Sequence, residues 1–414
     1  MQASFFQWLI GRTKRMVNSI AFYPSLIAAF FVGLSILMIS IDYSSFGTNI
    51  KSTWKMLRLR DASTARSIIS AIAAGLISLT VFSFSMVMIV LNQAASQMSN
   101  RILDKLIGNR FQQVVLGFYI GTIVYSLFLL STIRDIDSGI YVPSLSTYLL
   151  ILLTVGDIFL FIYFLHYITQ SVKYEIIISR IHTQTKKALQ STCRLNAIAE
   201  EAQSFQGQLL LTPVSGIFSG FNRDSLLTVL QKHNARLSLF HPLGKYLLEG
   251  LPLGRLETDS CQTEKDIAKD IFLNLFLTKE EFIDDNFVYG MRQLTEVALR
   301  SLSPGINDPG TAINSLHSLA DLLAFRLKHH PATTAYDEKG NLRLTTAEPT
   351  IEQILDQVLL PIWDYGKKDR LLHREMHTVL LQLQQVAPHP AISNLATEVE
   401  KQTTFRLTQN AWHD

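Results

Sequence analysis

Four long apolar runs constrain the fold of this chain more than any other feature. They extend over residues 19–41, 68–91, 114–133 and 145–168. Each has the roughly 20 residues that a helix needs to cross a hydrocarbon core of about 30 Å. None has Lys or Arg in its middle, where each would cost roughly 3 kcal/mol. Because lipid offers no hydrogen bonds to a peptide backbone, we predict four transmembrane helices.

The composition supports a division into a lipid-solvated and a water-solvated part. Only 17% of the 414 residues are charged, against about 25% in soluble proteins, and the deficit falls on the apolar first part of the chain. The net charge of +3 and the lack of a basic stripe argue against a nucleic-acid partner. Cys193 and Cys261 have neither zinc-site nor disulfide spacing, so we expect two reduced thiols.

The fold class that follows is a mainly α integral membrane protein with a cytosolic α+β domain. We assign residues 1–168 to the four-helix membrane domain and 169–206 to a helical stalk that continues the fourth helix. Short apolar segments between Gly and Pro turns predict a small β-rich module at 207–260. Helical periodicity predicts a helical cytosolic domain with a C-terminal bundle at 261–414, interrupted by a polar linker near 331–350.

The orientation in the membrane is predicted from Lys and Arg in the short flanking loops. With the N-terminus inside, eight such residues lie on the inner side and six on the outer side. The inner set is Arg12, Lys14, Arg15, Arg101, Lys105, Arg110, Lys173 and Arg180, and the outer set is Lys51, Lys55, Arg58, Arg60, Arg66 and Arg134. Since cytosolic loops carry the excess and four spans return the chain to its starting side, we expect both termini in the cytosol.

A stripe of small and polar residues, interrupted by two large apolar ones, runs along the second apolar segment. Its members are Ser78, Phe82, Ser85, Ile89, Asn92, Ser96 and Ser99. Spacings of three and four residues bring them to one face of a helix. Two interpretations stay open. The face is either a helix-packing surface or the lining of a water-filled pathway with apolar constrictions at Phe82 and Ile89.

The third and fourth apolar runs each contain a distinctive feature. Gly117 and Gly121 form a G-x-x-x-G pattern, which is typical of a close contact between transmembrane helices. Asp157 lies deep in the fourth run. A carboxylate at that depth must face the interior of the helix bundle, and it is a candidate for function. The alternative is a structural Asp that connects helices through hydrogen bonds.

One turn in the water-solvated part has unusually specific chemistry. In the segment SPGINDPG, Asp308 comes directly before Pro309, an arrangement typical of an N-cap followed by the first helical residue. Alternatively, Asn307 and Asp308 form a ligand or ion site together with the free amides of the helix start. The chain has no motif of a nucleotide-binding, hydrolase or metalloprotease site. We therefore expect no enzymatic activity, cofactor or resident metal.

Two segments together resemble a known family. They are VFSFSMVMIVLNQAASQMSNR at residues 81–101 and ALRSLSPGINDPGTA at residues 298–312. Both are similar to segments of a prokaryotic family of four-span predicted membrane proteins of unknown function. Asn100 departs from the family, which usually has Pro after the serine. The resemblance implies a multi-pass protein of a prokaryotic inner membrane, and it implies no activity or cofactor.

The function that these patterns favour is transport across the membrane. We expect a homo-oligomeric channel or related transport protein for a small ion or solute, with the second helix lining the pathway and the cytosolic domain regulating it. The alternative, from a different class, is a membrane sensor or scaffold whose cytosolic domain binds a ligand or partner protein. In both cases the lipid bilayer is a partner.

Overall fold

The computed structural model describes residues 21–53, 61–97, 110–133, 142–171, 173–195, 205–258 and 264–402. The chain divides into two compact units, Met1–Lys173 and Tyr174–Asp414. The first unit contains the apolar runs, and the second contains every described strand. The two units are treated one at a time below.

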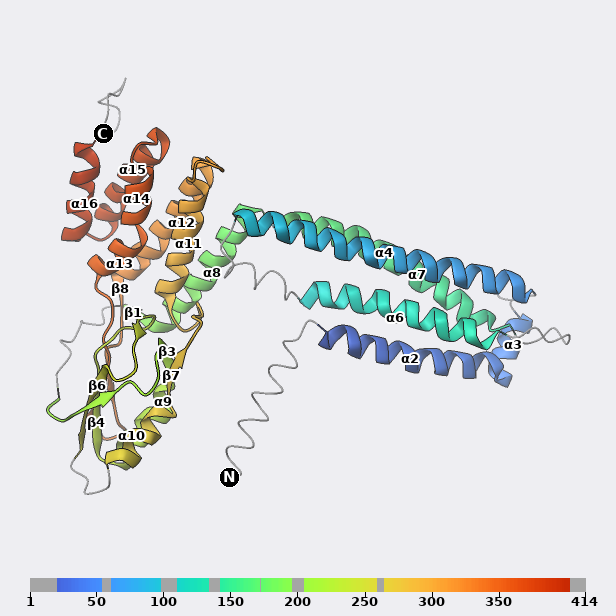
Figure 1. Cartoon of the computed structure of the whole chain (residues 1–414), viewed down its shortest axis with the longest axis horizontal. Coiled ribbons are helices and arrows are strands. Elements are labelled where there is room, and N and C mark those ends of the chain that lie inside the picture. Colours follow the sequence, from blue (N-terminus) through green and yellow to red (C-terminus); the bar gives the residue numbers. More distant parts are fainter. Residues whose placement is uncertain are drawn as a thin grey trace. The chain divides into compact units, whose positions relative to one another are not determined.

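The first unit contains the four predicted membrane-spanning helices, and this prediction is confirmed (Figure 1). They are α2 (Phe22–Tyr43), α4 (Ala62–Gln97), α6 (Arg110–Thr132) and α7 (Ser144–Ser171), with a short helix α3 (Ser45–Thr53) after α2. All four are long and apolar enough to cross a bilayer. In α6, 44% of the apolar window is buried, against 17% in each of the others. Thus α6 is the central helix, and the other three expose most of their surface.

The G-x-x-x-G pattern lies where α6 contacts α2. A Cβ atom added to Gly117 would lie 2.6 Å from Cδ1 of Ile27, and one added to Gly121 would lie 2.6 Å from Cδ2 of Phe31. Both distances are far below van der Waals contact, so only glycine allows the two helices to approach this closely. The buried ring of Phe31 fills the space that the absent side chain leaves.

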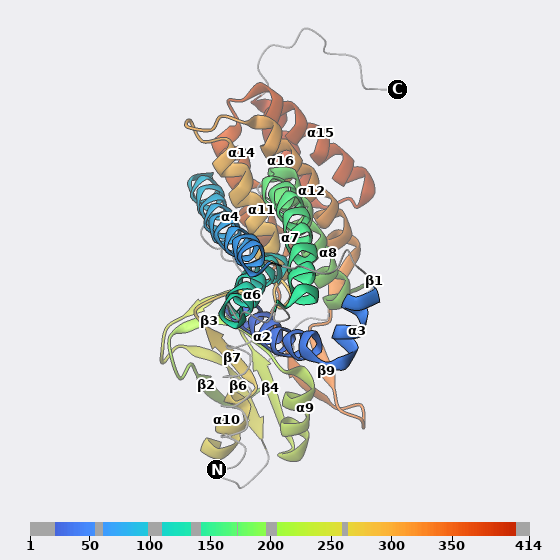
Figure 2. The same ribbon diagram turned by 90° about the vertical axis from the view of Figure 1, so that its right-hand side faces the viewer.

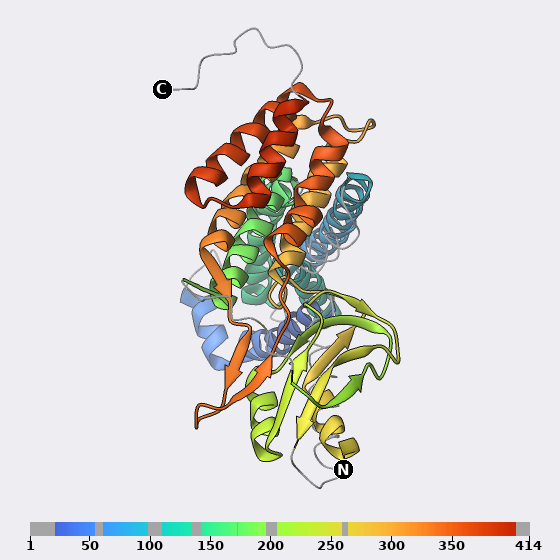
Figure 3. The same cartoon turned by 90° about the vertical axis from the view of Figure 1, so that its left-hand side faces the viewer.

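The second unit combines a helical bundle with a β-rich part, which Figure 3 shows at opposite ends of the unit. The bundle consists of α8 (Tyr174–Thr192), α11 (Phe287–Ser301), α12 (Pro309–Lys328), α13 (Ile351–Val358), α14 (Leu360–Gly366), α15 (Arg370–Val386) and α16 (Pro390–Lys401). The helices α8, α11 and α12 pack against one another. At their contact a Cβ added to Gly290 would overlap the side chain of Thr185.

The β-rich part has two sheets. The five-stranded sheet has the order β2 (Gln208–Leu211), β6 (Pro252–Thr258), β4 (Ala235–Leu239), β10 (Leu342–Thr345) and β9 (Thr334–Tyr336). The three-stranded sheet has the order β5 (Tyr246–Leu247), β3 (Gly216–Phe221) and β7 (Leu275–Thr278). Two helices, α9 (Arg223–Lys232) and α10 (Glu264–Phe272), pack against these strands (Figure 2). A ribbon of β1 (Cys193–Leu195) and β8 (His329–Pro331) completes the strands of the described residues.

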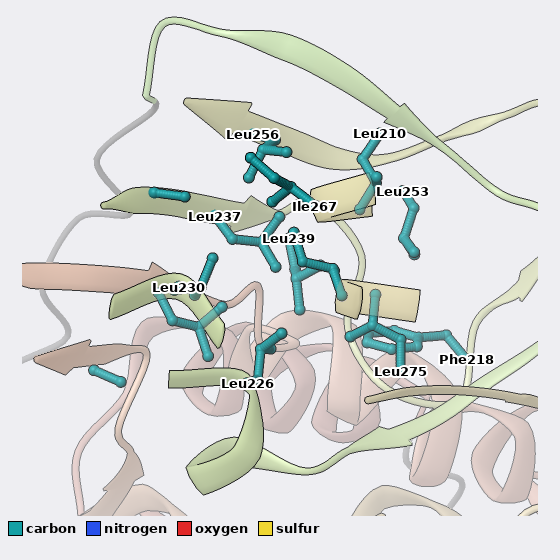
Figure 4. Close-up of a cluster of buried hydrophobic side chains, with 14 of the residues drawn as sticks. Leu210, Phe218, Leu226, Leu230, Leu237, Leu239, Leu253, Leu256, Ile267 and Leu275 are labelled. Carbon is teal, nitrogen blue, oxygen red and sulfur yellow. The ribbon is translucent and has the colours of Figure 1, made fainter. Parts of the chain in front are cut away.

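The core of the β-rich part is a cluster of leucines and other apolar side chains, shown in Figure 4. Leu226 and Leu230 of α9 and Ile267 of α10 are fully buried against Leu237 of β4. Fully burying such a side chain contributes roughly 1.5–3 kcal/mol each. This core explains why short strands, which are unstable in isolation, hold together here.

The predicted stalk at 169–206 differs from the structure. The helix α7 ends at Ser171, and α8 is a separate helix that begins at Tyr174. Its apolar stripe, which includes Ile177 and Ile181, is buried in the second unit against α11 and α12. The apolar periodicity identified the helix but not its partner, because a stripe of this kind fits any apolar surface.

The predicted linker near 331–350 also differs, because it contributes two strands to the main sheet. Strand β10 pairs parallel to β4, with Leu344 opposite Leu237, and antiparallel to β9. The β-rich part therefore draws on residues well beyond 207–260. The buried Arg343 side chain donates from Nε to Asp337 at 2.9 Å, which satisfies both charges inside the β9–β10 hairpin.

Candidate functional site in the membrane unit

The helix α4 has a buried face and an exposed face. The buried residues recur at helical spacing and pack against the other membrane helices; they are Ala65, Ile69, Ala73, Leu76 and Ser83. At 100° per residue, the stripe singled out from the sequence points to the opposite side. Ser78, Phe82, Ser85, Ile89 and Asn92 are all exposed, with Phe82 at 54% and Ile89 at 60%. The structure thus brings these five residues to one outward face of a protomer.

The two serines on this face bond within their own helix. Ser78 Oγ donates to the carbonyl of Ala74 at 3.0 Å, and Ser85 Oγ donates to that of Val81 at 2.9 Å. Phe82 also makes an edge-to-face contact with Phe161 of α7, at 5.9 Å between ring centroids. None of this buries the stripe, so it is not a packing surface within a single chain. The side chain of Ser96 and all of Ser99 lie outside the described residues.

A cluster of polar side chains lies on the buried side, where α4, α6 and α7 meet. Asp157 is 1% exposed and lies beside Thr122. The hydroxyl of Tyr119 lies beside Ser83 and interacts electrostatically with Asp157. Among the described residues, Oδ2 of Asp157 has no hydrogen-bond partner, and the Tyr119 hydroxyl and Oγ of Ser83 have none beyond each other. A buried carboxylate oxygen without a partner, near two hydroxyls with spare hydrogen-bonding capacity, is unusual in a native interior.

A second buried carboxylate, Asp42, is fully satisfied. It accepts hydrogen bonds from the backbone amides of Leu145 and Ser146, at 3.1 and 2.7 Å, and forms an ion pair with Lys51 at 2.7 Å. It therefore occupies the N-terminus of α7, where the free amides and the helix dipole favour negative charge. The sequence analysis did not single out Asp42. Its place at the end of the first apolar run, facing the S-L-S start of the fourth, was the available signal.

The turn before α12 is a helix cap. Asp308 accepts hydrogen bonds from the amide of Thr311 at 3.1 Å and from its hydroxyl at 2.6 Å, and Pro309 is the first helical residue. Asn307 has a φ of 48°, a left-handed conformation that Asn tolerates better than most residues. Both carboxylate oxygens of Asp308 are thus occupied by Thr311, which leaves capping as the role that its contacts support.

A shallow groove with a volume of about 500 Å³ lies between α12 and α15 of the second unit. Its rim contains a hydrogen bond between His317 and Glu375, at 2.7 Å, and Asp321, which contacts His182 and Lys186 of α8. Burial acts to raise the pKa of Asp321, but hydrogen bonds from Lys186 and His182 outweigh it and leave the pKa below its ordinary value. In the described part of the chain, no three His, Cys, Asp or Glu residues are grouped as a metal site would require.

The one described cysteine is a buried thiol. Cys193 is 4% exposed, and burial raises its pKa to about 11. A thiol that stays protonated at physiological pH is a poor nucleophile. Cys261 lies outside the described residues.

These features define a class of protein, a multi-pass membrane protein with four spans and a large extramembrane α+β unit. Within that class, the chain belongs to the DUF2254 family of predicted membrane proteins, whose profile matches residues 17–382. This confirms the family resemblance drawn from the two segments. The uncharacterized proteins Mb1321c of Mycobacterium bovis and Rv1290c of Mycobacterium tuberculosis are each 25% identical to it over 365 residues, covering 84% of this chain and 69% of each relative. No solved structure matches the chain.

Proposed function

We propose that the chain is the subunit of a homo-oligomeric channel or related transport protein for a small ion or solute, with α4 lining the pathway and the extramembrane unit regulating it. The observation that carries the proposal is the outward face of α4. Two serines and an amide, Ser78, Ser85 and Asn92, lie on it in line with Phe82 and Ile89. The two serines lie within the apolar run and Asn92 lies at its end, and a second subunit or a water column offers them polar partners that hydrocarbon does not.

The alternation of polar and apolar residues suits a gated pathway. Serine hydroxyls that donate within the helix still offer lone pairs to water. Rings of Phe82 and Ile89 from several subunits would form necks that exclude water when narrow, and such necks block ions without a physical plug. A small opening movement that wets them would then start conduction.

The test is ion leak from liposomes that contain the purified protein. Phe82→Ser and Ile89→Ser should each wet a neck and raise the leak well above that of the wild type. Substitutions of Asn92 should change the ratio of cation to anion flux. Phe84→Ser is the matched control, because Phe84 is similarly exposed, at 59%, but points about 120° away from the centre of the stripe.

Two results would contradict the proposal. One is an equal leak through the Phe84→Ser variant, which would mean that any polar substitution on α4 perturbs the bilayer. The other is a protein that is monomeric in a native-like bilayer, or an oligomer whose axis is lined by a helix other than α4. The five stripe residues would then be lipid-facing or contact residues.

A second candidate function is a sensor or scaffold that transports nothing. The groove between α12 and α15 favours it, because its apolar floor, which includes Ala324 and Leu383, and its charged rim suit a small ligand or a peptide. Wild-type and variant liposomes that all remain tight would favour this candidate. A ligand that raises the melting temperature of the wild type but not of a Glu375→Ala variant would then locate the site.

A further inference from the structure

The buried cluster on the inner side of α4 is separate from the exposed stripe and has chemistry of its own. Asp157 lies near the middle of the 28-residue helix α7 and is 1% exposed. An ionised carboxylate at that depth needs a positive partner, since its desolvation is otherwise costly. Among the described residues, none of Lys, Arg or His forms an ion pair with it, whereas Asp42 in the same unit has Lys51. Within the described residues, therefore, no positive side chain compensates an ionised Asp157.

The neighbouring hydroxyls indicate which species compensates it. The hydroxyl of Thr122 has two acceptors within reach, the carbonyl of Phe118 at 3.0 Å and the carboxyl group of Asp157. When it donates to Phe118, its oxygen can accept from a protonated carboxyl group, and when it turns to Asp157, it donates to the ionised one. Thr122 can therefore form a hydrogen bond with either form of Asp157.

The opposite side of the cluster fits the ionised form. The Tyr119 hydroxyl is fully buried, interacts electrostatically with Asp157 and has no hydrogen-bond partner among the described residues beyond the adjacent Ser83, which likewise has no other. These hydroxyls can turn their hydrogens toward the carboxylate when its proton leaves. Donors for the ionised form and an acceptor for the neutral form are both in place, so neither protonation state is locked.

We infer that Asp157, Thr122, Tyr119 and Ser83 form an intramembrane proton-binding site inside each protomer. On binding, the carboxylate takes a proton from hydronium, an O–H bond forms at the carboxyl group and water remains. On release, the proton returns to water and the Tyr119 hydroxyl donates to the carboxylate. The site lies within one chain and on the far side of α4 from the stripe, so it does not rest on the proposed pathway.

Other titratable groups on α7 and on the helices packed against it do not replace Tyr119 in this role. They are Tyr23, Asp42 and Tyr43 in α2, Lys51 in α3, Arg66 in α4, Arg110 and Tyr125 in α6, and Tyr148, Tyr163, His166 and Tyr167 in α7 itself. Asp42 pairs with Lys51 at Ser146, which is ~16 Å along α7 from Asp157. Tyr125 donates to the carbonyl of Ser146. Arg110 and His166 are each nine residues from the cluster along their helices, or ~13 Å.

The experiment is chemical labelling of the full-length protein in lipid nanodiscs with a lipophilic carbodiimide, which reacts with protonated carboxyl groups in apolar surroundings. Mass spectrometry locates the adducts. We expect labelling of Asp157 that falls about tenfold per pH unit once the pH exceeds its pKa. Asp42 is the internal control, because both of its carboxylate oxygens are occupied by Lys51 and the amides of Leu145 and Ser146, and it should stay unlabelled throughout. Asp157→Asn should remove the main adduct.

A variant tests the contribution of Tyr119 to the cluster. Tyr119→Phe removes the donor to the ionised form, so labelling of Asp157 should persist to higher pH than in the wild type. Thr80→Ala is its matched control, because the Thr80 hydroxyl on α4 is already satisfied by the carbonyl of Leu76 and lies outside the cluster. It should leave the pH profile unchanged.

Three results would overturn the proposal. Absence of labelling at Asp157 at every pH would show that it does not hold a proton. Protection by sodium, but not by choline, at fixed pH would assign the site to a metal cation instead. An unchanged pH profile of labelling in the Tyr119→Phe variant would show that Tyr119 does not donate to the ionised form of Asp157. If Phe82→Ser and Ile89→Ser did not raise the ion leak, the proposed pathway would be contradicted, but the labelling results at Asp157 would be unaffected.

Discussion

At the scale of single residues, the two buried carboxylates of the membrane unit, Asp42 and Asp157, differ in how far their oxygens are hydrogen-bonded. Asp42 is tied to the start of α7 by two backbone amides and to Lys51 by an ion pair. Asp157 has an oxygen without a partner among the described residues. A satisfied buried carboxylate connects structural elements, whereas an unsatisfied one inside a membrane helix is a candidate for function. The environment rather than the residue type separates the two roles.

The connection at Asp42 can be measured. Lys51→Met should destabilise the protein by roughly 3–5 kcal/mol, because it leaves the fully buried Asp42 without its counter-charge. Asp42→Asn should also destabilise it, since the amide nitrogen of Asn cannot accept from the amides of Leu145 and Ser146. The measurement is unfolding of the purified protein in detergent by denaturant or heat.

The double variant Asp42→Asn/Lys51→Met is the control for this pair. It removes both charges, so it should lose less than the sum of the two single variants. Strict additivity would mean that the ion pair contributes nothing and that each side chain acts by packing alone.

At the scale of elements, the glycines of α6 set the distance to α2. Gly117 and Gly121 have α2 side chains where their own Cβ atoms would be. A contact of this kind depends on dispersion between closely packed backbones, because lipid provides no hydrophobic drive for helix association. The contact between α2 and α6 therefore depends on the lack of side chains at Gly117 and Gly121 as much as on the α2 side chains that fill the space.

Enlarging these glycines should separate the helices. We expect Gly121→Leu to lower the melting temperature of the detergent-solubilised protein and to make α2 accessible to proteases. Gly156→Leu on α7 is the matched control, because nothing lies within 4 Å of the Cβ position of Gly156. Equal destabilisation by both variants would show that the effect comes from leucine in a membrane helix and not from the α2–α6 contact.

At the scale of the whole molecule, the even number of candidate spans in the described residues predicts that the segments before α2 and after α7 are on the same side of the membrane. The Lys and Arg distribution favours the cytosol for that side, by eight to six in the flanking segments. If the extramembrane unit regulates the pathway, it responds to conditions in the compartment on its own side of the membrane. Orientation is thus part of the functional proposal.

Reporter fusions test the orientation. A fusion after Asp414 should give a cytosolic signal, and one within residues 42–65 should give the signal of the opposite side. A fusion in the stretch between α6 and α7, at residues 134–141, is a second outer position and should agree with the first outer one. A C-terminal reporter on the outer side would reverse the topology, and regulation would then come from outside the cell.

The sequence by itself determined the features that depend on local periodicity. The spans, the glycine contact face and the Asp308 cap each need only neighbours in the chain, because hydrophobic length, small-residue spacing and cap chemistry are local properties. The alignment of Ser78 to Asn92 on one helix face also follows from 3.6 residues per turn. Part of the candidate site was therefore readable before the structure.

Only the tertiary structure decided how distant segments combine. The segment of residues 342–345 is too short to predict as a strand, and its pairing with β4 depends on Leu344 entering a core that it shares with Leu237, 107 positions earlier in the chain. In the same way, no spacing in the sequence relates Asp157 to Tyr119 or Asp42 to Ser146. Burial and the matching of polar groups depend on what lies across an interface, and that information is absent from any single helix.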